Sequence, residues 1–187
     1  MRVIEAANRK ILLKKIEDEN RKKLLKIIKQ IPNGVPDGWE KITFAVSGLM
    51  YIGFSDISTE KLIVISSQGQ SIINCRTGEK KYCEENYDEG NLIAIAEELG
   101  DEAISIAGEG GGGLRRYSKD GNILVSIAPD WPVEKIVFMP NYISWHQNPE
   151  KCTLIFEEYE IKAFGFSKCG NYIAVSNSNT LDIFKKQ

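Results

Sequence analysis

Acidic side chains that could act together gather in three short segments of the chain. In chain order the segments hold Glu84, Glu85, Asp88 and Glu89; Glu97, Glu98, Asp101 and Glu102; and Glu157, Glu158 and Glu160. Such a density of carboxylates suits docking on a basic protein, because complementary charge speeds association and helps to select the partner. Solvated loop charge is the plainer interpretation of the same residues. As the sharper hypothesis, we predict that these residues bind a basic protein partner.

Residues suited to catalysis or metal binding are few and poorly spaced. The sequence has one histidine, His146, and four cysteines without any Cys-x-x-Cys spacing: Cys75, Cys83, Cys152 and Cys169. Nucleophilic catalysis needs a base beside a serine or cysteine, and there is no Gly-x-Ser-x-Gly motif. Glycoside hydrolysis uses a pair of carboxylates, but the chain has so many Asp and Glu residues that no one pair stands out as a candidate. We therefore predict a protein that is not an enzyme, holds no cofactor or metal, and keeps its cysteines as free structural thiols.

A glycine-rich run at residues 108–113 formally matches the dinucleotide pattern G-x-G-x-x-G. That fingerprint places a pyrophosphate at the start of a following helix, whereas residues 114–121 have the pattern of a strand and a turn. We expect a flexible hairpin tip here, since glycine tolerates positive φ. Arg115 and Arg116 are candidates for holding an anion, although one of two adjacent strand residues normally faces solvent.

The segments that must position these residues begin with a basic helix. Residues 1–30 carry ten Lys or Arg and four Asp or Glu, a net charge of +6, while the remaining residues carry fourteen basic and twenty-two acidic side chains, a net charge of −8. Apolar residues recur at helical spacing, which predicts an amphipathic helix over residues 1–31, bent or split at residues 18–20 or continuous. Pro32 and Gly34 end it and begin a linker over residues 32–39.

Three roles fit the basic helix: a lid over an open sheet end, a nucleic-acid arm, or a helix at a membrane surface. Its apolar stripe is aliphatic, and no aromatic residue occurs before Trp39. Interfacial helices and single-strand binders use aromatic residues, so we favour the lid and expect neither membrane nor nucleic-acid binding. No apolar run approaches the ~20 residues of a membrane span, and the start lacks a secretory signal. These features predict a cytoplasmic protein.

Residues 40–187 show the pattern of an antiparallel β domain. Residues 52–66 and 164–176 are two copies of one unit, in which an apolar strand containing Gly-Phe-Ser is followed by a polar turn and a second apolar strand. A blurred third copy spans residues 92–107, although residues 92–99 also fit a short helix. Further strands are expected at residues 41–46, 113–117, 133–139, 142–145 and 152–156.

The repeated unit resembles a blade of the WD-repeat or related β-propeller families. The likeness rests on Gly53, Phe54 and Ser55, the strand at residues 62–66, and the segment ending in Thr-Gly-Glu at residues 77–79. Ile73 and Asn74 stand where those families have Trp-Asp, and no Gly-His pair is present. The resemblance implies a meander of blade-like units. About 149 residues follow Trp39, and blades of roughly 40–45 residues need at least four copies to close a ring. We therefore predict a mainly β fold, as an open sheet, a sandwich or an incomplete propeller, with an N-terminal amphipathic helix covering exposed edges.

In overall character the chain is similar to the immunity proteins of bacterial toxin systems, which are small, non-catalytic and acidic. That similarity implies docking of acidic loops on the basic, substrate-binding face of a toxin nuclease. A propeller-like scaffold with another protein partner is the alternative, and a nucleic-acid-binding protein that uses the basic helix is the less favoured one. The sequence leaves homo-oligomer formation open.

Overall fold

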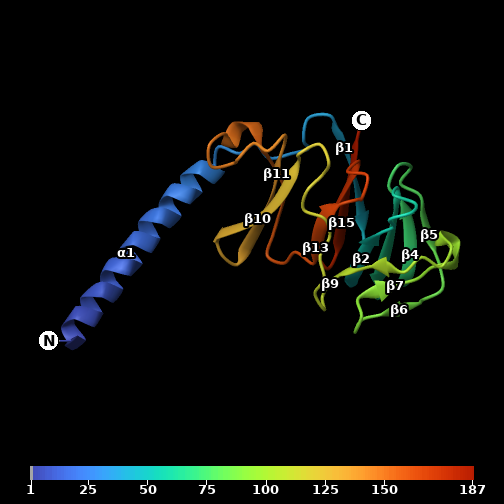
Figure 1. Cartoon of the computed structure of the whole chain (residues 1–187), viewed down its shortest axis with the longest axis horizontal. Helices are drawn as coiled ribbons and strands as arrows, with labels where there is room; N and C mark the ends of the chain where they lie inside the picture. Colours follow the sequence, from blue (N-terminus) through green and yellow to red (C-terminus); the bar gives the residue numbers. More distant parts are fainter. Residues whose placement is uncertain (1) are drawn as a thin grey trace.

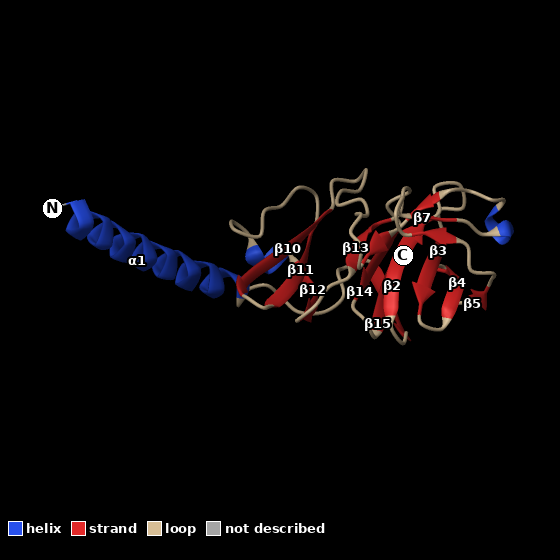
Figure 2. Ribbon diagram, turned by 90° about the horizontal axis from the view of Figure 1, so that it is seen from below, coloured by secondary structure: helices blue, strands red, loops and turns tan. Residues whose placement is uncertain are grey.

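The computed structural model describes residues 2–187 of the chain, with the side chains of residue 9 and residues 12–187. Over this range the protein is mainly β: one long N-terminal helix leads into strands that form four antiparallel sheets. Both views show the sheets following one another in a row that starts at the helix (Figures 1 and 2). They are open sheets, and the described residues form no closed propeller. No helix in this range is both long and apolar enough to cross a membrane.

Helix α1 (Arg2–Ile28) is continuous, although polar residues interrupt its apolar pattern at residues 18–20. Its sequence is rich in Lys, Arg, Leu and Glu, which all favour helix. The backbone N–H of Ile31 still bonds the carbonyl of Ile28, in a tighter turn, and Pro32 then provides no N–H to continue the ladder.

Most of α1 extends away from the sheets (Figure 1). Its C-terminal end packs on the β body, where Ile28 and Ile31 are buried in one cluster with Val137 and Leu154. Apolar side chains farther from that end remain exposed: Leu12, Leu13 and Ile16. The prediction that the helix acts as a lid is therefore wrong for residues 12–23, whose side chains are exposed; among the described side chains of the helix, those near its C-terminal end cover the apolar surface.

The two copies of the sequence repeat fold into matching units of three consecutive antiparallel strands. The first unit consists of β2 (Leu49–Phe54), β3 (Lys61–Ser66) and β4 (Gly69–Asn74). The second consists of β13 (Ala163–Phe166), β14 (Tyr172–Ser176) and β15 (Thr180–Lys186). The predicted strand pairs are confirmed in both copies. We call these the first and second modules.

Additional strands complete the sheets of both modules. The first sheet has the order β5-β4-β3-β2-β9, with β5 (Lys80–Tyr82) and β9 (Ala107–Gly108) at its edges. The second has the order β1-β15-β14-β13, with β1 (Trp39–Ala45) outermost. Because β1 pairs with β15 along its whole length, the start and the end of the β body are held together.

Two smaller sheets pack against the two modules. The sheet next to α1 consists of β10 (Ile123–Asp130), β11 (Val133–Met139) and β12 (Thr153–Glu158). The sheet beside the first module consists of β6 (Tyr87–Asp88), β7 (Ile93–Ala94) and β8 (Ile104–Ser105). Two short 3-10 helices lie in connections, η1 (Glu97–Leu99) and η2 (Pro149–Lys151).

Three sequence expectations change in the structure. Residues 142–145 form turns, because Asn141 and Tyr142 have φ of 49° and 60°, in a left-handed region that a strand does not use. Residues 113–117 make isolated bridges only, from Arg115 to Phe166 and from Tyr117 to Ile123. Residues 92–99 contain β7 and η1 in place of either a full strand or an α-helix.

The core joins the two modules face to face. Leu62 and Ile73 of the first module lie in one buried cluster with Ala174, Leu181 and Ile183 of the second. A second cluster, which is rich in aromatic residues, joins the second module to the sheet next to α1. The turns that follow β2 and β13 are thereby fixed relative to each other.

Candidate functional site

Two acidic segments come together because one buried side chain holds both of them. Gln70 of β4 is fully buried, and its amide nitrogen Nε2 donates to the carbonyl of Ile95 at 2.7 Å. Its amide oxygen Oε1 accepts the backbone N–H of Asn86 at 3.1 Å. The N–H of Ile95 in turn bonds the carbonyl of Asn86 at 2.8 Å. Residues 84–86, which follow β5, are therefore held beside residues 95–98, which follow β7.

An open cleft of about 520 Å³ lies between these segments. Every charged residue that lines it is acidic: Glu84, Glu85, Glu97, Glu98 and Asp101. Ile95 and Ala96 contribute apolar surface to it, and Asn86 contributes an amide. One of these carboxylates has a cationic partner: the ammonium of Lys81 lies 3.6 Å from a carboxylate oxygen of Glu98. We call this site the acidic cleft.

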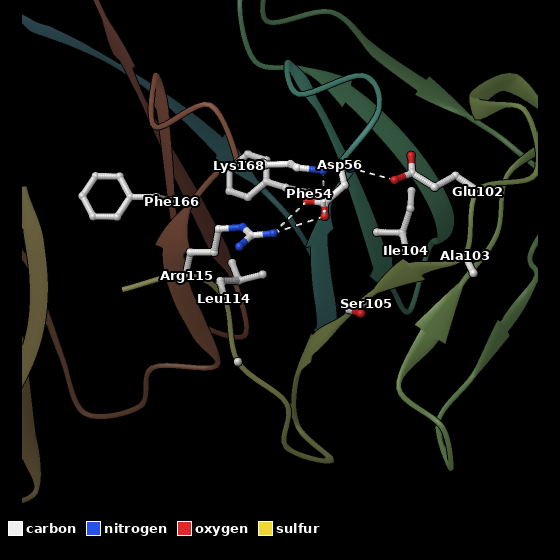
Figure 3. A pocket seen from close by; sticks show the side chains of 11 residues that line it. Phe54, Asp56, Glu102, Ala103, Ile104, Ser105, Leu114, Arg115, Phe166 and Lys168 are labelled. Carbon is white, nitrogen blue, oxygen red and sulfur yellow. Dashed lines mark hydrogen bonds and ion pairs between the residues drawn. The ribbon is translucent and has the colours of Figure 1, made fainter. Parts of the chain in front are cut away.

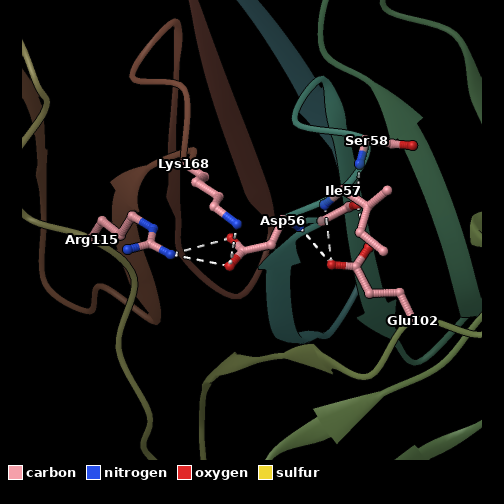
Figure 4. A network of polar contacts seen from close by, with 7 residues as sticks. Asp56, Ile57, Ser58, Glu102, Arg115 and Lys168 are labelled. Atoms are coloured by element: carbon pink, nitrogen blue, oxygen red, sulfur yellow. Dashed lines mark hydrogen bonds and ion pairs between the residues drawn. The ribbon is translucent and has the colours of Figure 1, made fainter.

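Two of the three remaining acids of the first two predicted segments, Asp88 and Glu102, have partners within the protein. Asp88 accepts from the side-chain and backbone nitrogens of Asn91 at 2.7 and 3.0 Å, and these hydrogen bonds lower the pKa of Asp88. Glu102 accepts the N–H of Asp56 at 2.7 Å, that of Ile57 at 3.3 Å and the hydroxyl of Ser55 (Figure 4). The carboxylate of Glu102 therefore caps the turn after β2. Glu89 is exposed.

The third acidic segment lies in a different sheet. Glu157 of β12 pairs with Lys135 of β11, and Glu158 is exposed on the same strand. Figure 2 shows β12 separated from β5 and β7 by the second module.

Glu160, in the bend after β12, has a cation and a hydroxyl as partners. It pairs with Lys162 at 2.9 Å and accepts the hydroxyl of Ser178 at 2.7 Å. The hydrogen bond from Lys162 is the main cause of the lowered pKa of Glu160 and of the raised pKa of Lys162. Of the eleven predicted partner-binding residues, five thus line the acidic cleft and six lie outside it.

A second hollow lies where the turns of the two modules face each other (Figure 3). This pocket of about 360 Å³ is lined by Asp56, in the turn after β2, by Lys168, in the equivalent turn after β13, and by Arg115. Nη2 of Arg115 lies 3.1 and 3.3 Å from the two carboxylate oxygens of Asp56, and Nζ of Lys168 lies 3.5 Å from one of them. We call it the inter-module pocket.

The repeated Gly-Phe-Ser segment gives both turns their shape. Ser55 and Ser167 are buried at equivalent positions. The hydroxyl oxygen of Ser55 accepts the N–H of Ser58 at 2.7 Å, and that of Ser167 accepts the N–H of Tyr172 at 3.2 Å. The residue that follows each serine, Asp56 or Lys168, lines the pocket in both modules, with opposite charge.

Arg116 occupies a different environment from its neighbour Arg115. Its guanidinium carbon lies 3.1 Å from the ring centroid of Phe164, a cation–π contact, and burial lowers the pKa of Arg116. Of the two arginines predicted to hold an anion, Arg115 alone lines the inter-module pocket.

The glycine-rich run at residues 108–113 forms a tight loop after β9, in which the N–H groups of Gly108 and Gly111 bond each other's carbonyl oxygens. The next element after the run is strand β10, not a helix, so the geometry of a dinucleotide fingerprint is absent there. His146 stacks on Trp145 with 3.7 Å between ring centroids. The four cysteines are unpaired in the described range, and burial raises the pKa of Cys75 to about 12 and that of Cys152 to about 11.

Among the described side chains, no group of three or more His, Cys, Asp or Glu residues is arranged to hold a metal ion. The sequence analysis did not identify Gln70, Asp56 or Lys168 as site residues. The one available signal was the position shared by Asp56 and Lys168 in the two copies of the repeat.

No protein-family model matches this chain, and no curated protein matches it. The resemblance to WD-repeat blades therefore stays a prediction from the repeat motif.

Proposed function

We propose that the protein is a non-catalytic binding module that uses its acidic cleft to dock on a basic protein. The observation that supports this proposal is the convergence of five carboxylates from two separate segments around one open cleft that no basic residue lines. The buried side chain of Gln70 orders both segments before any partner arrives. Such order reduces the entropy lost on binding.

The physical role of the cleft follows from its charge. A field of one sign attracts Lys and Arg side chains over several ångströms, which raises the association rate and makes binding sensitive to salt. Ile95 and Ala96 provide apolar contact on which the aliphatic part of a lysine or arginine could pack. A basic loop or helix end of a partner protein is the kind of segment that this cleft suits.

Within this class we favour a toxin nuclease as the partner, in keeping with the similarity to immunity proteins. A nuclease needs a basic surface to bind its anionic substrate. Occupying that surface with an acidic cleft would block substrate binding without any chemistry by this chain. The proposal requires no cofactor, no metal and no membrane.

The test is capture of partners by a tagged protein from its native cells at low salt, with two variants run in parallel. The double variant Glu84→Lys/Glu97→Lys reverses two charges of the cleft, and neither side chain makes a hydrogen bond or ion pair among the described residues. The control is Glu17→Lys/Glu150→Lys, which makes the same change in charge at two exposed positions outside the cleft. Mass spectrometry then identifies the proteins captured by each.

The expected result is a stoichiometric basic protein that the wild type and the control capture and the cleft variant loses. With the purified pair, the cleft variant should bind at least tenfold more weakly, which corresponds to about 1.4 kcal/mol, and binding should weaken as salt rises. If the partner is a nuclease, the wild type should also inhibit its activity. Equal capture by both variants would exclude the cleft as the docking site, and the absence of any basic partner would reject the proposed function.

A further inference from the structure

The inter-module pocket is a second candidate site, whose lining combines two cations, Arg115 and Lys168, with two carboxylates, Asp56 and Glu102. We propose that it binds a small ligand with a carboxylate or phosphate group, which Arg115 and Lys168 hold after displacing Asp56. In the free protein Asp56 occupies the position of the ligand's anionic group (Figures 3 and 4). This inference does not depend on the proposed function.

The guanidinium of Arg115 has unused binding capacity. Asp56 contacts it through Nη2 alone, so that both carboxylate oxygens share one nitrogen. Within the described chain, Nε and Nη1 make no hydrogen bond or ion pair. The strong arrangement for arginine with a carboxylate or phosphate is a bidentate one that uses two nitrogens. An incoming anion can therefore form a better-matched pair with Arg115 than Asp56 does.

The internal ion pairs that the ligand must break are weak. The side chains of Asp56, Arg115 and Lys168 are 47%, 53% and 50% exposed. Ion pairs exposed to this degree contribute little to stability, because solvent screens the charges. Two cations meet at this one carboxylate, so an anion that replaces it keeps both of them paired.

The second carboxylate of the pocket does not compete for these cations. The oxygens of Glu102 accept the backbone N–H groups of Asp56 and Ile57 and the hydroxyl of Ser55. Figure 4 shows the carboxylate of Glu102 on the opposite side of Asp56 from Arg115 and Lys168. Asp56 is thus the group that an anion has to displace.

The corresponding positions of Asp56 and Lys168 in the two modules favour a binding site over an accidental ion pair. Asp56 and Lys168 follow equivalent buried serines in equivalent turns, which the core between the modules fixes in place. The pocket also includes the apolar residues Phe54 and Leu114, which suit a small organic body next to the anionic group. A few charged groups beside apolar surface are a common means of recognising such ligands.

The experiment titrates isotope-labelled protein with sodium phosphate and, separately, with sodium benzoate at constant ionic strength, and follows backbone amide shifts by NMR. The variants are Asp56→Asn, Arg115→Gln and Lys168→Gln. The matched control is Lys186→Gln, which removes a lysine that pairs with Asp120 elsewhere on the surface. Asn keeps the size of Asp56 and the backbone N–H bond to Glu102.

The expected result is saturable binding of at least one anion by the wild type, with the largest shifts at residues 56, 114–115 and 168. Asp56→Asn should bind about fivefold more tightly because the competing carboxylate is gone, whereas Arg115→Gln and Lys168→Gln should each bind about tenfold more weakly. Lys186→Gln should bind as the wild type does. Saturation by phosphate alone or by benzoate alone would identify which anionic group the pocket takes.

Two results would overturn the proposal. One is an absence of saturable shifts at these amides with either anion, which would leave Asp56, Arg115 and Lys168 as an internal structural cluster. The other is an Asp56→Asn variant that binds no more tightly than the wild type. Circular dichroism of each variant would verify the fold, and the wild-type titration tests the site without any substitution.

Discussion

Gly53 and Gly165 occupy the same position in the two modules, and another segment of backbone crosses close to each of them. A Cβ atom at Gly53 would lie 2.5 Å from the carbonyl oxygen of Ser105, and one at Gly165 would lie 2.3 Å from Cβ of Leu114. These approaches are shorter than van der Waals contact permits. The glycine of the Gly-Phe-Ser segment is therefore required by the crossing of a neighbouring segment and not by a turn.

We expect Gly165→Ala to destabilise the fold because the added methyl group must push Leu114 and Arg115 away from β13. Overpacking of this kind costs about 1–3 kcal/mol, which would lower the melting temperature of a chain of this size by about 2–12 °C. Thermal unfolding followed by circular dichroism measures the change. The control is Gly113→Ala, since a Cβ there meets no atom within 4 Å. Equal melting temperatures for the two variants would contradict the crossing argument.

Single-residue chemistry was only partly predictable from the sequence. The density of Glu and Asp at residues 84–85 and 97–101 pointed to the acidic cleft, because charge clusters are visible in a linear chain. The role of Gln70 could not be predicted, because the sequence does not indicate which loops a polar residue in a strand will hydrogen-bond. The pairing of Asp56 with Lys168 joins residues more than a hundred positions apart, and it became visible only when the two modules were packed together.

Helix α1 meets the β body through its C-terminal end. Ile28 is buried there, and Arg21 bonds the carbonyl of Pro129 and the carboxylate of Asp130. The exposed side chains of Leu12, Leu13 and Ile16 contribute nothing to the fold that the structure shows. The helix is thus anchored at one end and free of the sheets along most of its length.

Removal of residues 1–19 should therefore leave the β body folded, with a melting temperature within about 2 °C of the full chain. Ile28→Ala, in contrast, removes a buried side chain and should cost about 2–5 kcal/mol. Calorimetry of the full chain, the truncated chain and the substituted chain compares the two effects. Unfolding of the truncated chain would restore the lid as the role of the helix.

Elements with strong alternation or repetition were predictable, and those set by local turns were not. The strands of both modules lie where Ile, Val and Phe cluster between turn residues. Residues 142–145 have strand-like composition, yet Tyr142 adopts a left-handed φ and its ring packs where a Cβ on Gly121 would lie, 2.3 Å from the nearest ring atom. The backbone N–H of Tyr142 also bonds the carbonyl of Gly121 at 2.8 Å, a contact that the sequence pattern did not reveal. The sequence also did not predict that α1 extends beyond the sheets, because an apolar stripe does not indicate which part of the helix will pack against them.

On the scale of the whole molecule, the row of open sheets is held together by side chains of one sheet that pack against another sheet. Trp39 is the clearest example. It lies in β1, is 7% exposed, and its ring meets Phe138 of β11 edge-on at 5.7 Å and Phe166 of β13 at 6.5 Å. One side chain thereby ties the small sheet next to α1 to the sheet of the second module.

We expect Trp39→Ala to destabilise both of these sheets together. Loss of a buried tryptophan costs about 3–5 kcal/mol through lost burial and a residual cavity, and the aromatic contacts add to that loss. Hydrogen exchange measured peptide by peptide should show faster exchange in β11 and in β13–β15 alike, while Tyr159→Ala, at a side chain that is 73% exposed, should change neither. Faster exchange confined to β10–β12 would mean that the small sheet unfolds on its own and that Trp39 does not couple the two sheets.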